Sequence, residues 1–204
     1  MEIPLQFITK YPKAFDENKK YPLVIYLHGA GSRGRDVSIL ETAAIMQYRD
    51  KCEAFPAIII APQCHADTWF DIFQDLLAFI EKQTQKDYID ENRIYLTGVS
   101  MGGYASWQVL MSKPELFAAA AILCGGGMYW NAGRLKNIPI YAYHGMLDEA
   151  VKVEESIKMV NAVNRSGGKA SLTIFEDLEH NCWDRVYSDP KTYEVLFQHR
   201  KEGV

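Results

Sequence analysis

The sequence lacks a long apolar run, since no stretch approaches the roughly 18 residues that a membrane-spanning helix requires. Residues 1–22 also lack a basic segment followed by an apolar one, so we expect no signal peptide and a cytoplasmic location. Basic residues are outnumbered, with 22 Lys and Arg against 26 Asp and Glu, which gives a formal charge of −4. Because there is no polybasic stretch either, we expect the chain to bind neither nucleic acid nor membranes.

Cysteine is also scarce, and its spacing excludes the usual cysteine frameworks. Cys52, Cys64, Cys124 and Cys182 form no CxxC pair and no zinc pattern. Cys52 and Cys64 flank an apolar run whose ends would lie roughly 20 Å apart if it is a strand. A disulfide needs Cα atoms closer than about 7 Å, so we expect these two to stay unbonded. Free thiols and no metal site are the prediction.

What the sequence does contain is a regular alternation of short apolar runs with longer amphipathic ones. Strands are predicted at 5–11, 22–29, 57–63, 93–99, 117–125, 138–145 and 171–178, and helices at 38–51, 71–85, 102–114, 151–168 and 189–201. The run at 117–125 is ambiguous, because alanine also suits a helix. Strands that are apolar throughout are typical of a mostly parallel sheet covered on both faces. We therefore predict a three-layer α/β fold, with residues 1–204 forming one domain.

The stretch "RIYLTGVSMGG" (93–103) places Ser100 between Gly98 and Gly102, directly after a predicted strand and before a predicted helix. Gly-x-Ser-x-Gly in this position is typical of a sharp turn that exposes a serine nucleophile, the glycines allowing strand and helix to approach closely. A tight turn in which Ser100 only caps the next helix is the alternative, so its partners must decide.

A serine nucleophile needs a base, and the base needs an orienting acid, here expected in the order serine, acid, histidine. Asp148 follows the strand at 138–145 and is the candidate acid; it could instead cap the next helix, and Glu149 is its nearest competitor. Only His180 and His199 lie beyond Asp148. His180 follows the last predicted strand, whereas His199 falls in the terminal helix, so we predict a Ser100–Asp148–His180 triad.

The glycine-rich loop "HGAGSRG" (28–34) follows the first buried strand. We expect the backbone N–H groups of Ala30 and Met101 to form the oxyanion hole, although a plain strand-to-helix turn would look the same. Four aromatic residues in loops near the predicted site are candidate substrate-binding residues, or simply a cover over the upper edge of the core. They are Trp69, Tyr129, Trp130 and Trp183.

These segments together resemble the α/β-hydrolase superfamily, in its compact esterase and dienelactone-hydrolase-like branch, which includes phospholipase/carboxylesterase-type proteins and predicted peptidases related to prolyl oligopeptidase. The resemblance covers "YPLVIYLHGAG", "APQ", "DENRIYLTGVSMGGYASW", "YHGMLDEAV" and "EHNCW". It implies hydrolysis of carboxylic esters through an acyl-enzyme, with no metal or organic cofactor. Dienelactone hydrolase itself uses a cysteine nucleophile where this chain has Ser100.

Two departures from the superfamily pattern concern the ends of the sheet and the entrance to the site. The segment before the first buried strand is short, which leaves open that N-terminal edge strands are missing. Residues 126–137 are too few for a cap domain, so we expect an open site. The expected partner is a small-molecule ester, with aryl and sugar esters as candidates. A serine peptidase or acyltransferase with the same triad, and a non-catalytic binding protein on the same fold, are the alternatives.

Overall fold

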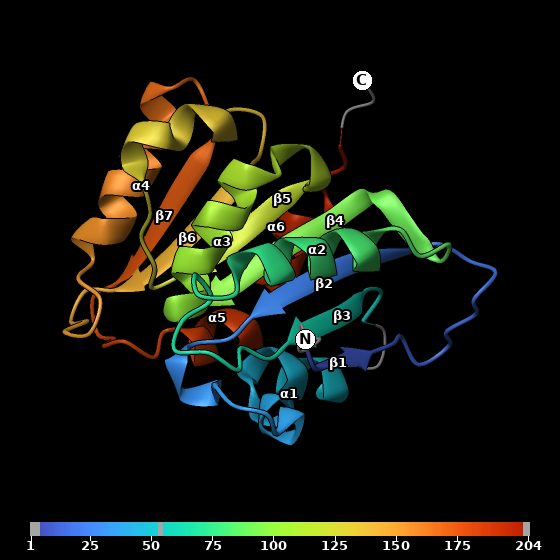
Figure 1. Cartoon of the computed structure of the whole chain (residues 1–204). Coiled ribbons are helices and arrows are strands. Elements are labelled where there is room, and N and C mark those ends of the chain that lie inside the picture. The colour runs from blue at the N-terminus through green and yellow to red at the C-terminus, as the bar shows by residue number, and fades with distance from the viewer. Residues whose placement is uncertain (1–4, 53–54, 202–204) are drawn as a thin grey trace.

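A seven-stranded sheet organises the chain (Figure 1). The computed structural model describes residues 5–52 and 55–201. Only the edge strand β1 runs antiparallel to its neighbour β3; the other pairs are parallel, in the order β1-β3-β2-β4-β5-β6-β7. The strands are β1 Phe7–Lys10, β2 Tyr21–Leu27, β3 Ile58–Pro62, β4 Ile89–Val99, β5 Ala119–Leu123, β6 Ile140–Gly145 and β7 Ala170–Phe175. The predicted mostly parallel sheet is confirmed.

Helices cover both faces of this sheet (Figure 1). The α-helices are α1 Ala44–Lys51, α2 Phe73–Thr84, α3 Met101–Ser112, α4 Glu154–Arg165, α5 Trp183–Ser188 and α6 Pro190–Phe197. Short 3-10 helices occupy several connections: η1 Ala30–Ser32, η2 Val37–Thr42, η3 Pro114–Leu116 and η4 Tyr129–Leu135. Between β5 and β6 the only element is η4, so no cap domain lies over the carboxyl edge of the sheet there.

The core consists of two layers, because alternate side chains of a strand point to opposite faces. In β2, Leu23, Ile25 and Leu27 belong to the cluster that packs against α2, α3 and α4. Val24 and Tyr26 belong to the other cluster, against α1, α5 and α6. Each of these side chains is at most 5% exposed. Burial on both faces explains why the strands read as uninterrupted apolar runs.

Three segments differ from the prediction. The helix predicted at 38–51 is divided at Ala43, whose extended backbone (φ −62°, ψ 140°) separates η2 from α1. The Thr42 hydroxyl donates to the Ile39 carbonyl at 2.7 Å, a local bond that competes with helix continuation. Strand β4 begins at Ile89 rather than 93, because Ile89 pairs with Tyr21 of β2 across an irregularity in register.

The third segment that differs from the prediction is α5, which forms where a loop was expected. It spans six residues, too few for an amphipathic period to be recognised. It ends at Ser188, and the side chain of the next residue, Asp189, accepts from the Lys191 N–H and caps α6. The predicted helix at 189–201 is confirmed but ends at Phe197.

The ambiguous alanine-rich run is a strand, β5, buried along its whole length between β4 and β6. All four cysteines are free, as expected, and Cys64, Cys124 and Cys182 are buried. Within the described residues, no helix combines the length and apolarity needed to cross a bilayer.

Candidate active site

Ser100 occupies the turn between β4 and α3 with φ 55° and ψ −120°, a conformation that residues with side chains rarely adopt. The flanking glycines make this turn possible. A Cβ atom at Gly102 would lie 2.0 Å from the Leu27 carbonyl oxygen, and one at Gly98 would lie 2.4 Å from the Gly102 carbonyl oxygen. Strand and helix therefore touch backbone to backbone, and Ser100 stands half-buried at the carboxyl edge of the sheet.

The structure brings the three predicted triad residues together. His180 Nε2 lies 2.8 Å from Ser100 Oγ, and His180 Nδ1 lies 2.6 Å from Asp148 Oδ2. An ionised carboxylate only accepts hydrogen bonds, so Nδ1 carries a proton and donates it to Asp148. Nε2 is then free to accept from the Ser100 hydroxyl. A general base placed and oriented in this way can activate a serine for attack.

Asp148, in the loop between β6 and α4, is held ionised. Its side chain is fully buried, and its Oδ1 accepts from the N–H groups of Ala150 and Val151 at 2.9 and 2.8 Å. Burial alone would raise the pKa of the Asp148 carboxyl, but hydrogen bonds from His180, Val151 and Ala150 outweigh it and hold that pKa below its usual range. The carboxylate can therefore orient His180 and stabilise the imidazolium that forms during reaction.

The competing candidates for acid and base do not join this arrangement. The Glu149 side chain is 86% exposed and pairs with Lys152. His199 Nε2 lies 2.8 Å from the Tyr141 hydroxyl, at the opposite end of the sheet. The geometry thus selects Asp148 over Glu149 as the acid and His180 over His199 as the base.

Buried contacts hold the loop that carries His180 in place. The His180 carbonyl accepts from the Cys182 N–H at 3.0 Å and from the Cys124 thiol at 3.1 Å. The two thiols themselves lie 2.9 Å apart. A Cβ atom at Gly145 would lie 2.1 Å from the Glu179 carbonyl oxygen, so glycine is required where the loop crosses β6. These contacts explain how a residue 80 positions from Ser100 is held within hydrogen-bonding distance of it.

The predicted oxyanion donors lie at the starts of two helical segments that meet at Ser100. Ala30 opens η1 and Met101 opens α3, and the first N–H groups of a helix have no intrahelical acceptor. A Cβ atom at Gly29 would lie 3.4 Å from Ser100 Cβ, so the Ala30 loop is in contact with the nucleophile turn. Both N–H groups are thus available for a developing oxyanion.

His28, which the sequence reasoning did not single out, supports that loop. Its buried ring donates from Nδ1 to the Gly29 carbonyl at 2.7 Å and accepts at Nε2 from the Cys64 N–H at 2.9 Å. Burial lowers the pKa of His28 to about 4, so the ring is neutral near pH 7 and can both donate and accept. A histidine next to a glycine-rich loop was the only trace of this role in the sequence.

The prediction that Trp69 binds substrate is wrong. Its side chain is 0% exposed, its Nε1 donates to the His28 carbonyl at 3.1 Å, and its ring lies 4.9 Å from the His28 ring. A tryptophan can be buried at little cost when its N–H finds an acceptor, as here. Trp69 supports the oxyanion loop from within the core instead of contacting substrate.

The other three predicted aromatics lie outside the core, in different situations. Trp183 is half-buried and packs edge-on against the His180 ring, with centroids 5.3 Å apart. Tyr129 and Trp130 are 51% and 73% exposed and pack on each other. Trp183 therefore adjoins the triad, whereas the Tyr129–Trp130 pair stands at the surface.

A hollow of about 470 Å³ beside the nucleophile turn was not foreseen. Tyr104, one helical turn after Ser100, is part of its wall, and its amide donates to the Ser100 carbonyl at 3.0 Å. None of the four predicted aromatics lines it. The walls are Phe70, Phe73, Tyr104, Gln108, Gly126, Gly127, Met128 and Glu155. Phe70 and Phe73 lie one and four positions after Trp69, so the aromatic cluster was visible in sequence, but its inward and outward members were not distinguishable.

Cys124, His144 and Asp148 bring three potential metal-ligand atoms within 4.8 Å of one another. Each atom already has a protein partner: Cys124 donates to the His180 carbonyl, His144 Nε2 lies 2.8 Å from the Val151 carbonyl, and Asp148 accepts from His180. The donor set fits a hydrogen-bonded network better than a metal site.

Comparison with known sequences gives matches to esterases and to one peptidase family. A sequence profile described as "Prolyl oligopeptidase family" matches residues 65–132, which include Ser100. A protein named "Probable feruloyl esterase C" from Aspergillus oryzae is 25% identical over 167 residues, covering 80% of this chain. The chain spans 62% of that relative's length.

The similar solved structures also include both an esterase and a peptidase. "A Thermostable Esterase" is 34% identical with a TM-score of 0.82, and the match covers 97% of this chain and 60% of that one. The acylaminoacyl peptidase of Pyrococcus horikoshii has a TM-score of 0.73 at 16% identity, covering 100% of this chain and 41% of that one. The likeness to this solved peptidase is one of fold alone. The esterase likeness extends to sequence.

Proposed function

We propose that this chain, which has the α/β-hydrolase fold, is a serine hydrolase that cleaves carboxylic esters through an acyl-enzyme. The observation that carries the proposal is the hydrogen-bonded sequence Ser100–His180–Asp148 at a strained turn. The esterases among its relatives support the choice of ester over other acyl substrates.

The reaction follows from the geometry in two halves. His180 Nε2 takes the Ser100 proton while Oγ attacks the ester carbonyl, and Asp148 stabilises the resulting imidazolium. The N–H groups of Ala30 and Met101 donate to the tetrahedral oxyanion. His180 then gives its proton to the leaving alcohol, and Ser100 remains acylated. Water, deprotonated by His180, repeats the sequence and releases the acid.

The hollow beside Ser100 supports an aryl or apolar group as one half of the substrate. Phe70, Phe73 and Met128 offer apolar surface, which favours binding of a flat or aliphatic group. Gln108 and Glu155 place polar atoms in the same walls and can bind a hydroxyl or amide of the substrate. Feruloyl esters, named in the relatives, combine an aryl ring with a hydroxyl and fit both features.

The test compares the parent chain with Ser100→Ala on p-nitrophenyl acetate, p-nitrophenyl butyrate and methyl ferulate. We expect the variant to lose nearly all activity on each ester while its thermal unfolding midpoint stays close to that of the parent. A fluorophosphonate probe should label the parent and not the variant. An unlabelled parent would favour a non-catalytic binding protein, and an active variant would mean another nucleophile.

A serine peptidase is the second candidate, because the matched family profile is that of the prolyl oligopeptidases. The triad itself does not discriminate, since attack and acyl transfer are common to esters and amides. The matched pair is a p-nitrophenyl ester and a p-nitroanilide of the same acyl group. We expect hydrolysis of the ester only; comparable kcat/KM values on the anilide would favour the peptidase.

A further inference from the structure

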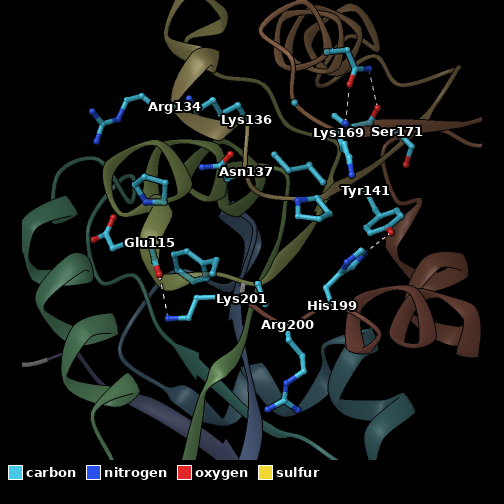
Figure 2. A pocket seen from close by; sticks show the side chains of 18 of the residues that line it. Glu115, Arg134, Lys136, Asn137, Tyr141, Lys169, Ser171, His199, Arg200 and Lys201 are labelled. Carbon is cyan, nitrogen blue, oxygen red and sulfur yellow. Dashed lines mark hydrogen bonds between the residues drawn. The ribbon is translucent and has the colours of Figure 1, made fainter. Parts of the chain in front are cut away.

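Figure 2 shows a large groove, whose volume is about 1270 Å³. It lies at the opposite edge of the sheet from Ser100. Its floor includes Ala118, Ile140 and Ala170, which lie at the amino ends of β5, β6 and β7. Ser100 follows the carboxyl end of β4, which is parallel to these strands. The groove is therefore separate from the candidate active site, and nothing in the proposed reaction uses it.

The charge of the groove is opposite in sign to that of the whole chain. Five basic side chains line it against one acidic side chain, that of Glu115, whereas the chain as a whole carries −4. The basic residues are Arg134, Lys136, Lys169, Arg200 and Lys201, which surround the opening in Figure 2. An excess of one sign inside a concave surface focuses the electrostatic potential there.

Within the part of the chain that the structure describes, most of these basic side chains have no ion-pair partner. Arg200 pairs with Asp90 at 3.0 Å. Lys201 Nζ donates to the Glu115 carbonyl at 3.2 Å, and Arg134 Nε donates to the Met111 carbonyl. These are neutral acceptors. Across residues 5–52 and 55–201, no carboxylate lies within ion-pair distance of four of the cations: Arg134, Lys136, Lys169 and Lys201.

We propose that this groove binds an oligoanion, a short chain or ring that carries several phosphate or carboxylate groups. The four cations come from separate segments: Arg134 and Lys136 lie at the end of η4, Lys169 precedes β7, and Lys201 follows α6. A single anionic group would engage only part of this set, whereas spaced anionic groups can engage all of it. The side chains of Asn137 and Ser171 add neutral donors to the lining of the groove.

Calorimetric titration with sodium tripolyphosphate and with tetragalacturonate, at 50 and 200 mM salt, tests the groove in the whole chain. We expect at least one probe to bind, with an affinity that falls as salt rises. Lys136→Glu/Lys169→Glu should weaken binding at least tenfold. The matched control is Lys13→Glu/Lys20→Glu, the same charge change at two exposed lysines outside the groove, and it should leave affinity within about twofold.

Each outcome of the titrations either supports or overturns the proposed anion site. Binding of the phosphate probe alone, or of the sugar acid alone, identifies the anionic group and supports the site. Absence of binding by both, or equal losses in the groove variant and the control, overturns it. Because both lysines of the groove variant are exposed, it should unfold at the parent's temperature; Lys136→Gln/Lys169→Gln serves if it does not. Ser100→Ala should bind like the parent, so the result is independent of the proposed function.

Discussion

Replacing Asp148 by asparagine keeps the shape of the side chain but should reverse the proton arrangement of His180. The N–H groups of Ala150 and Val151 both donate to Oδ1, so the asparagine carbonyl oxygen must take that place. The amide nitrogen is then directed at His180 Nδ1, which now lies 2.6 Å from the second carboxylate oxygen. An amide N–H facing Nδ1 forces the ring to accept there and to carry its proton on Nε2.

A proton on Nε2 removes the base from Ser100, because the same atom lies 2.8 Å from Ser100 Oγ and can no longer accept. Loss of the correct tautomer in a serine triad lowers kcat about 10⁴-fold, which corresponds to about 5 kcal/mol of transition-state stabilisation. KM should change little, because Asp148 is buried beneath His180 and does not reach the substrate hollow.

The assay is the steady-state hydrolysis of p-nitrophenyl acetate at pH 8, with thermal unfolding as the check that the variant is folded. Glu149→Gln makes the same charge change on the adjacent exposed side chain and should keep kcat within about twofold of the parent. A folded Asp148→Asn variant that retains more than about one-thirtieth of the parental kcat would refute the tautomer reasoning.

Other perturbations test the remaining parts of the structure. Gly102→Ala places a Cβ atom 2.0 Å from the Leu27 carbonyl oxygen, and thermal denaturation should show a large loss of stability, absent in Gly31→Ala, where nothing lies within 4 Å. Esterase activity should fall on the acid side through one ionisation, since the pKa of Asp148 lies below its usual range and its carboxylate stays charged there; two acid ionisations in the pH–rate profile would contradict this. Burial lowers the pKa of His28 to about 4, so the unfolded chain binds a proton at this residue before the folded chain does as pH falls below 6.5. Denaturant titrations should therefore show that about 3 kcal/mol of the unfolding free energy is lost between pH 7 and 4. A His28→Gln variant should lack this loss. Treatment with a chelator should leave the hydrolytic rate unchanged, and restoration of a lost rate by added metal would argue against a cofactor-free reaction.

Local sequence features were sufficient to predict most of the strand positions and the candidate nucleophile. Runs such as 22–29 are apolar on both faces, and this alone indicates a covered parallel strand. The spacing of Gly98, Ser100 and Gly102 reflects contacts between backbone atoms, which depend on the absence of a Cβ rather than on distant partners. The wrong secondary-structure predictions also have local causes. Helix α5 is too short for a hydrophobic period to appear. The division at Ala43 coincides with a hydrogen bond from the Thr42 side chain to the backbone, which the hydrophobic pattern does not reveal.

By itself, the sequence determined the sheet, the order of the triad residues and the turn that exposes Ser100, because periodicity and glycine spacing are properties of neighbouring residues. Tertiary structure alone decided which aromatics face the substrate and which lie in the core. Trp69 and Phe70 are adjacent in the chain, yet one is 0% exposed and the other 50%. Successive side chains point in different directions, and which direction leads to solvent depends on what the rest of the chain packs there. The same holds for the basic groove, which collects cations from segments between Arg134 and Lys201.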